Sequence, residues 1–176
     1  MKKFPFLLLD AGPIIKLFEL GIWDEFIKRC DVTIPRTIVE DETIYADRED
    51  SREYIEYGLK SYEDKGQIKI IDADSQKVKW FLDKFDSMYK SIIHDGEKEA
   101  LAFLYNNSEP YKLCTSDSGV FKVLGLLGKG EQGISLEEVL QQIGRLQELE
   151  KWYTKKFREQ YTRMGQADFI QDKGLR

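Results

Sequence analysis

The stretch FLLLDAGP, residues 6–13, decides how this chain is expected to fold. Its short apolar run is typical of a buried strand, and the glycine and proline end that strand. Pro13 suits the first turn of a following helix. Asp10 therefore stands where the strand ends, at the carboxyl edge of a sheet, where open α/β sheets bind their ligands. A plainer interpretation is that Asp10 only caps the next helix, and the other acids of the chain decide between the two.

Further apolar runs alternate with helical patterns along the chain. We predict strands over residues 31–35, 68–72 and 111–115, with a last short strand near Ile134. Helices between these strands, including one over residues 74–90, imply parallel strands joined by right-handed crossovers. The predicted fold class is therefore α/β, with a central parallel sheet of about four or five strands flanked by helices and a C-terminal helical extension.

The composition favours one globular domain with a highly charged surface. A chain of 176 residues, 41% hydrophobic and 34% charged, can bury a substantial core. The net charge of −5 argues against a DNA coat or a polybasic membrane binder, because neutralising phosphates needs a basic footprint. It leaves nucleic acid open as a partner, because bound metal ions can supply positive charge locally.

Cysteine usage and hydropathy argue against several further classes of protein. Cys30 and Cys114 are the two cysteines, without a CxxC spacing, which argues against a disulfide framework or a zinc knuckle. No apolar run approaches membrane-spanning length, and the first residues do not resemble a secretory signal. We therefore expect a cytoplasmic protein.

Acidic residues recur where predicted strands end and the next helices begin. Asp10 ends the first strand, residues 40–42 follow the second, Glu97 lies in the first turn of a helix, and Asp117 follows the fourth strand. In a parallel sheet all these points face the same edge. Carboxylates that converge without partners are driven to take up protons, and hard divalent cations remove that conflict. The pattern predicts a cation site at this edge.

Several motifs in this order resemble the PIN-domain (PilT N-terminus-like) ribonucleases. They are LLLDAGPIIKLFELG, IPRTIVEDETIYA, HDGEKEALAFL and KLCTSDSGVFKVLG, and GISLEEVL resembles the strand and helix that end that fold. The resemblance covers about residues 4–143. It implies a nuclease domain over residues 1–143, followed by an amphipathic helical extension over residues 144–176. It also implies RNA as substrate and Mg²⁺ or Mn²⁺ as the cofactor that activates water.

The family places its metal site at four acids. Asp10, Glu97 and Asp117 match three of these positions directly. The resemblance therefore assigns them as metal ligands and catalytic residues. The hydroxyl groups of Thr115 and Ser116 are expected to support the site, as is common in the family.

The remaining acid is one of three neighbours. Glu42 has a hydrophobic residue three positions before it, which is the usual family spacing, and Asp41 has the same spacing with the less usual acid. Glu40 lies three residues after Thr37, the spacing of a capping box, so we assign it a supporting structural role. We predict Glu42 as the fourth metal-binding and catalytic acid.

His94 is the single histidine, so the chain can build neither a histidine-based triad nor a histidine-rich metal site. It precedes a helix for which Asp95 is the expected N-cap, and we expect it to be structural or solvent-facing. Two other enzyme classes fit less well. A haloacid-dehalogenase-type phosphatase would want an acid where Gly12 stands, and the acidic pair and lysine of a receiver domain cannot be placed.

The C-terminal segment has a different character. Residues 145–176 hold eight Lys/Arg against five Asp/Glu, a net of +3, which leaves −8 for residues 1–144. Apolar residues recur there at helical spacing up to about Gly165: Leu146, Leu149, Tyr153, Phe157, Tyr161 and Met164. This predicted helix either folds back on the domain, forms a homodimer or protein-partner site over residues 145–164, or meets single-stranded RNA through its aromatic and basic side chains.

Together with the acidic cluster, the family resemblance implies a Mg²⁺- or Mn²⁺-dependent ribonuclease that hydrolyses phosphodiester bonds with a metal-activated water. Toxins of toxin–antitoxin pairs are common in the family, so an antitoxin-like protein is one expected partner of residues 145–164. The alternative function is a catalytically silent PIN-like adaptor that acts through its C-terminal helix.

Overall fold

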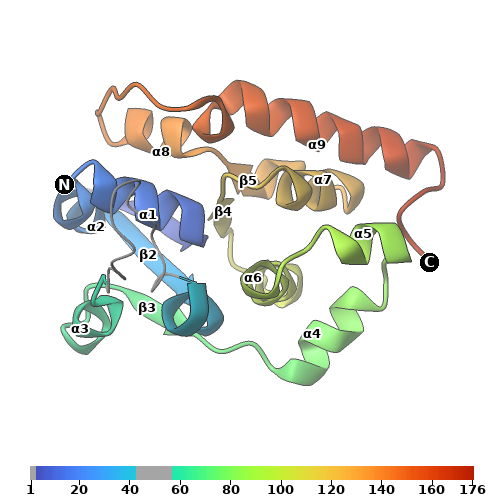
Figure 1. Cartoon of the computed structure of the whole chain (residues 1–176), viewed down its shortest axis with the longest axis horizontal. Coiled ribbons are helices and arrows are strands. Elements are labelled where there is room, and N and C mark those ends of the chain that lie inside the picture. Colours follow the sequence, from blue (N-terminus) through green and yellow to red (C-terminus); the bar gives the residue numbers. More distant parts are fainter. Residues whose placement is uncertain (1–2, 43–56) are drawn as a thin grey trace, which may run out of the picture.

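A computed structural model describes residues 3–42 and 57–176 of the chain, without the side chains of residues 41 and 42. Its centre is a five-stranded, all-parallel sheet with the order β3-β2-β1-β4-β5 (Figure 1). The strands are β1 (Phe4–Leu9), β2 (Cys30–Pro35), β3 (Lys69–Ile71), β4 (Lys112–Cys114) and β5 (Gly133–Ile134). The predicted α/β class with a parallel sheet is confirmed.

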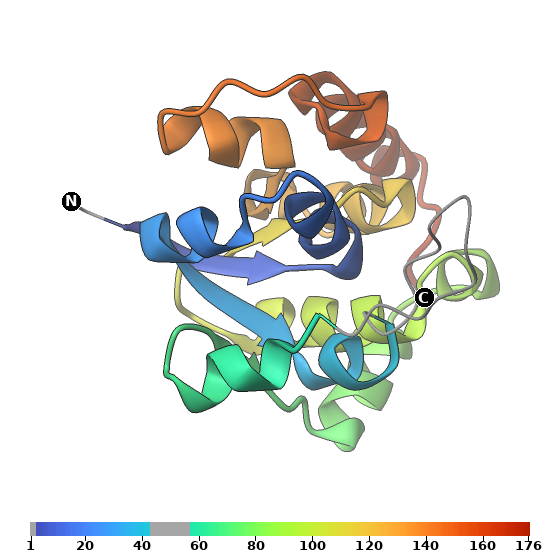
Figure 2. The ribbon, with the colours of Figure 1, turned by 60° about the vertical axis from the view of Figure 1, so that its left-hand side comes forward.

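Helices cover both faces of this sheet. The first face carries α1 (Ala11–Glu19), α2 (Trp23–Arg29), α3 (Leu59–Asp64) and α8 (Leu136–Gln142). The second face carries α4 (Ser75–Leu82), α5 (Ser87–Ser91), α6 (Asp95–Asn106) and α7 (Ser118–Leu126). In Figure 2 the blue α1 and the yellow-green α6 lie on opposite sides of β1. Short helical turns complete the chain: η1 (Ile38–Glu42), η2 (Gly130–Gln132) and η3 (Lys151–Tyr153).

The apolar residues 7–9 of β1 lie between two hydrophobic cores, one on each face of the sheet. Leu7, Leu8 and Leu9 are completely buried. Leu7 and Leu9 pack into the cluster on the first face, whereas Leu8 packs into the cluster on the second. Successive side chains of a strand point to opposite faces of its sheet, so a strand covered on both sides needs an unbroken apolar sequence. In the part of the chain that the structure describes, no helix is long and apolar enough to span a membrane.

The helix predicted over residues 74–90 is instead two helices, α4 and α5, with a break between them. Phe85 forms an isolated antiparallel bridge with Leu175 in the break. Asp86 then caps α5 by accepting a hydrogen bond from the Tyr89 backbone N–H at 2.9 Å. Its own backbone N–H donates to the carbonyl oxygen of Gly174 at 2.9 Å. The periodic apolar pattern could not reveal this contact, because it comes from the far end of the chain.

The predicted C-terminal helical extension is confirmed, but it is not one continuous helix from residue 145. Residues 145–150 are not helical, η3 follows, and the long helix is α9 (Lys155–Ile170). The apolar stripe is buried only in part: Tyr153 is buried and Phe157 of α9 contacts Phe121 of α7, whereas Leu146 is 86% exposed and Met164 is 43% exposed. The residues of α9 that are buried are Thr162 and Gly165.

Small residues explain how α9 docks. It lies along α7 (Figure 1), and the two backbones touch. A methyl group on Gly165 would lie 1.9 Å from the carbonyl oxygen of Lys122, and one on Gly125 would lie 2.1 Å from that of Thr162. Neither position can hold a side chain, so glycine allows the close approach. Of the arrangements considered for residues 145–164, the fold-back on the domain is present in this structure.

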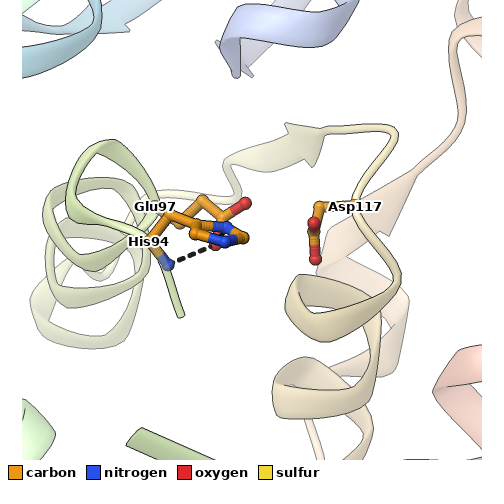
Figure 3. Close-up of side chains that lie close together, drawn as sticks. All are labelled: His94, Glu97 and Asp117. Atoms are coloured by element: carbon orange, nitrogen blue, oxygen red, sulfur yellow. Dashed lines mark hydrogen bonds and ion pairs between the residues drawn. The ribbon is translucent and has the colours of Figure 1, made fainter. Parts of the chain in front are cut away.

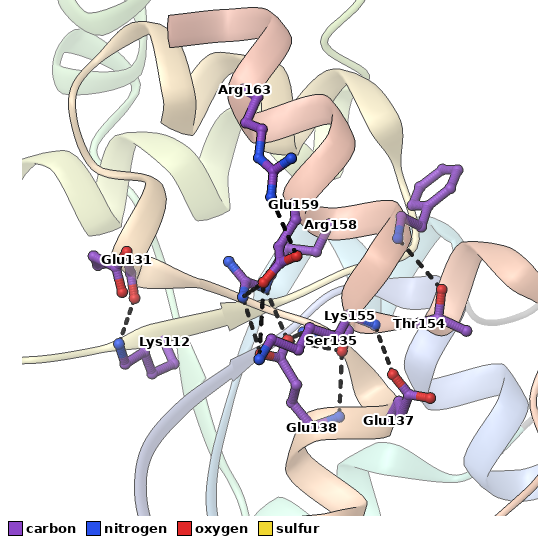
Figure 4. Close-up of polar contacts among 11 residues, drawn as sticks. Lys112, Glu131, Ser135, Glu137, Glu138, Thr154, Lys155, Arg158, Glu159 and Arg163 are labelled. Carbon is purple, nitrogen blue, oxygen red and sulfur yellow. Dashed lines mark hydrogen bonds and ion pairs between the residues drawn. The ribbon is translucent and has the colours of Figure 1, made fainter.

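Polar contacts hold the start of α9 against α8 (Figure 4). Arg158 donates two hydrogen bonds to the Glu138 carboxylate, at 2.8 and 3.0 Å. Thr154 caps α9 by accepting from the Phe157 N–H at 3.3 Å. The Lys155 N–H donates to Glu137 at 2.7 Å. A bidentate arginine–carboxylate pair fixes orientation as well as distance, so the start of α9 is fixed on the domain.

Candidate metal centre

Asp10 occupies the junction between β1 and α1, at the carboxyl edge of the sheet. Its backbone N–H extends the β1–β4 pairing by donating to the carbonyl oxygen of Cys114 at 3.0 Å. Its Oδ1 accepts from the Ala11 N–H at 2.9 Å, so Asp10 is the N-cap of α1. Its Oδ2 accepts from the hydroxyl of Thr115 at 2.5 Å. The carboxylate is 6% exposed and is held from two sides.

Thr115 links Asp10 to Asp117. Its side chain is completely buried directly after β4, and its Oγ1 also accepts from the Asp117 N–H at 3.0 Å. Asp117 in turn caps α7, because its Oδ1 accepts from the N–H groups of Gly119 and Val120, at 2.5 and 3.2 Å. The two aspartates therefore follow neighbouring parallel strands, and one threonine fixes their relative position.

Glu97 reaches the same edge from the first turn of α6. The carboxylate is 6% exposed, and its Oε2 accepts from the backbone N–H of His94 at 2.8 Å. Burial raises the pKa of Glu97 to about 7, and the negative charges of Asp10 and Asp117 raise it too, whereas the His94 N–H opposes the shift. Because the charges of both aspartates act on Glu97, the three acids lie in one region of the sheet edge.

His94, and not Asp95, is the N-cap of α6, so that prediction is wrong. The imidazole Nδ1 lies 3.3 Å from Glu97 Oε2. One potential ligand atom from each of His94, Glu97 and Asp117 lies within 4.8 Å of the other two. In Figure 3 the imidazole and the Glu97 carboxylate stand side by side, and Asp117 faces them from the start of α7. His94 is the helix cap and its side chain is 71% exposed, in line with the expected structural or solvent-facing role, and it also borders the acidic cluster.

Ser116, which was expected to support the site, packs against the start of α1. Ser116, partly buried, lies against Gly12, where an added methyl group would be 2.2 Å from the serine Oγ. The phenol of Tyr153 closes the same corner by donating to the carbonyl oxygen of Gly12 at 3.1 Å. A side chain at Gly12 would therefore require the Ser116 hydroxyl to move.

The second acid position lies largely beyond what the structure describes. The side chains of Asp41 and Glu42 fall outside the described residues, so the choice of Glu42 stays a prediction. Glu40 is exposed and pairs with Arg36 at 3.5 Å. The expected capping box between Thr37 and Glu40 is wrong, because the Thr37 N–H donates to Glu99 at 2.9 Å. The turn η1 is a π-helix that starts at Ile38, which removes the geometry that a capping box needs.

Glu99 is the acid that the sequence analysis missed. It is 7% exposed, and its two oxygens accept from the backbone N–H groups of Thr37 and Ala73, at 2.9 and 2.8 Å. These amides follow β2 and β3, so one carboxylate ties the ends of two strands to α6. The sequence offered only a weak signal, an acid directly before the apolar residues Ala100 and Leu101.

Comparisons with known proteins add no family assignment. No protein-family profile matches the chain, no curated protein is significantly similar in sequence, and no solved structure matches its fold with significance. The α/β architecture and the geometry of the carboxyl edge therefore carry the functional argument.

Proposed function

We propose that this protein is a divalent-metal-dependent ribonuclease of the PIN-domain type. The observation that carries the proposal is the meeting of Asp10, Glu97 and Asp117 at one edge of a parallel sheet. Glu97 is buried, and the other two acids disfavour its ionisation, which raises its pKa to about 7. A divalent cation would favour the ionised form of all three, because it replaces repulsion with attraction.

The donor set fits Mg²⁺ or Mn²⁺. These ions prefer carboxylate and water oxygens, and the three acids offer carboxylates on separate elements. Asp10 and Asp117 each accept hydrogen bonds that hold them in place. Hydrogen bonds to ligating carboxylates orient them toward a metal. Asp10, Glu97 and Asp117 would hold the ion, together with Glu42 as the predicted fourth acid.

A bound divalent ion would supply two things, a water that ionises near neutral pH and a positive charge beside the scissile phosphate. The residues of this chain would hold the metal ligands in position. Thr115 holds Asp10 and Asp117 in register, and Gly12 lets Ser116 approach the end of β1. RNA is the proposed substrate because of the family resemblance, and the same resemblance supports a role as the toxin of a toxin–antitoxin pair.

Cleavage of a labelled single-stranded RNA pool by the purified full-length chain tests the proposal. We expect cleavage with Mn²⁺ and none with excess chelator. Asp117→Asn should lower the rate by about a thousandfold or more, because loss of one oxyanion or metal contact costs about this much in enzymes. Asparagine keeps an oxygen that can cap α7, so the fold is preserved.

A matched control uses an acid at the opposite edge. Glu109 is exposed in the loop before β4, and Glu109→Gln removes the same charge without touching the cluster. This variant should cleave at the wild-type rate. Folded wild-type protein that leaves the RNA pool intact with every divalent ion tried would overturn the proposal.

A second candidate function is an adaptor that acts through its C-terminal helix. One observation favours it. Three apolar residues of α9 are exposed: Met164, Phe169 and Ile170, at 43%, 56% and 79%. Apolar side chains that remain exposed on a helix can contribute to an interaction surface. In that case the chain would bind a protein partner and show no metal-dependent cleavage.

A further inference from the structure

Among the described residues near the acidic cluster, His94 carries an imidazole and not a carboxylate. One ring nitrogen of His94 lies within 4.8 Å of a carboxylate oxygen of Glu97 and of Asp117. Donor atoms on opposite sides of an ion with bonds of about 2.1 Å are about 4.2 Å apart. The side chain of His94 is 71% exposed, so its imidazole has room to rotate. Adjacent donors on such an ion are about 3.0 Å apart, so rotation of these side chains would bring the three donors onto one ion.

His94 already has a role at the start of α6. It is the N-cap, and the capping box has two parts: the His94 side chain accepts from the Glu97 backbone N–H, and the Glu97 carboxylate accepts from the His94 backbone N–H at 2.8 Å. Helix N-caps more often carry asparagine, aspartate, serine, threonine or glycine. An imidazole differs from these side chains because it can also bind a metal ion. Its Nδ1 lies 3.3 Å from the Glu97 carboxylate.

We propose that His94 is a metal ligand of this site, so that the centre is a mixed nitrogen and oxygen site for a first-row transition ion such as Mn²⁺. Imidazole suits transition ions, whereas Mg²⁺ prefers oxygen donors. His94, Glu97 and Asp117 together then select Mn²⁺ over Mg²⁺. The inference rests on the proposed metal site, but it does not depend on RNA being the substrate.

The chain offers an unusually clean test, because His94 is its only histidine. Protein labelled with ¹⁵N-histidine and loaded with Mn²⁺ alone should show a hyperfine coupling from that nitrogen in pulsed electron paramagnetic resonance. The same protein grown with unlabelled histidine should show the ¹⁴N pattern instead. Absence of histidine coupling in protein that binds Mn²⁺ would overturn the inference.

A binding measurement with matched variants gives a second readout. His94→Asn keeps a favourable N-cap but removes the imidazole. We expect its Mn²⁺ affinity to fall by at least about tenfold, a typical loss when a metal site is disturbed, while its Mg²⁺ affinity changes by less than about twofold. Asp95→Asn is the control, since this 82% exposed neighbour is outside the donor group and should leave the Mn²⁺-to-Mg²⁺ preference unchanged. Equal loss of both ions in His94→Asn would contradict the inference.

The outcomes separate this inference from the proposed nuclease function. RNA cleavage without histidine coupling would remove His94 from the ligand set and leave the nuclease proposal intact. Histidine coupling without cleavage of RNA would establish the metal centre and overturn the nuclease proposal. Failure of the wild-type chain to bind Mn²⁺ at all would overturn both.

Discussion

The carboxyl edge of the sheet and the seam between α7 and α9 are built on opposite principles. At the edge, carboxylates that repel one another are held together by hydrogen bonds, and burial raises the pKa of Glu97 to about 7. At the seam, backbones touch because Gly125 and Gly165 leave no side chain between them. The edge is under electrostatic strain that a ligand could relieve, whereas the seam is complete as it stands. Substitutions should therefore act in opposite directions in the two regions.

The largest expected effect is at the seam. Gly165→Ala adds a methyl group that would lie 1.9 Å from the carbonyl oxygen of Lys122, which is backbone and cannot move aside. We expect the free energy of unfolding to fall by about 3 kcal/mol, the upper part of the range for overpacked sites. Chemical denaturation measures it. Gln160→Ala, at an exposed position of the same helix, is the control and should change stability by less than about 0.5 kcal/mol.

At the edge, removing a charge should have the reverse effect. In metal-free protein, Glu97 ionises near pH 7 when folded but near pH 4.5 when unfolded. Between these values the folded state binds more protons, so stability falls as the pH rises through this window and then levels off. Glu97→Gln keeps an acceptor for the His94 N–H but cannot ionise. We expect it to exceed wild type in stability by about 2 kcal/mol at pH 8 and to match it near pH 4.

Melting curves in chelator at a series of pH values provide the measurement. The quantity of interest is the difference between wild type and Glu97→Gln at each pH, because other titrating groups cancel in that difference. A difference that stays constant from pH 4 to pH 8 would mean that Glu97 is not under electrostatic strain, and the contrast between edge and seam would disappear.

The contrast also explains which features the sequence could reveal. A strand buried on both faces is apolar throughout, so the apolar residues 6–9 predicted β1. The parallel pairing of β1 with β4 then places Asp10 and Asp117 at the same edge of the sheet. Glu99 was missed because a buried carboxylate that accepts backbone N–H groups looks, in sequence, like any helical surface acid. The second acid of the site remains a sequence-based choice, since the side chain of Glu42 is outside the described residues.

The tail was misread for a physical reason. Apolar periodicity predicts a buried face on the assumption that burial is driven by large side chains. In α9 the residues buried closest to the backbone of α7 are Thr162 and Gly165, which carry almost no hydrophobic signal, although Phe157 of the stripe adds a ring contact with Phe121. Close approach of two helices needs small residues, and a pattern of small residues three positions apart was the sign to look for.

The smallest expected effect is on the other side of α9. Met164 and Ile170 are 43% and 79% exposed and point away from the face that carries Thr162 and Gly165, so replacing both with serine should change stability by less than about 1 kcal/mol. The comparison with Gly165→Ala is then made within one helix, between an inner face that tolerates no added atom and an outer face that tolerates polar residues.

Sedimentation equilibrium of wild type and of M164S/I170S would show in addition whether the outer face of α9 binds a second copy of the chain. We expect equal masses, because α9 already has its partner in α7. A larger wild-type mass that the double variant loses would instead identify the outer face of α9 as a self-association surface, and it would favour the adaptor function over the nuclease.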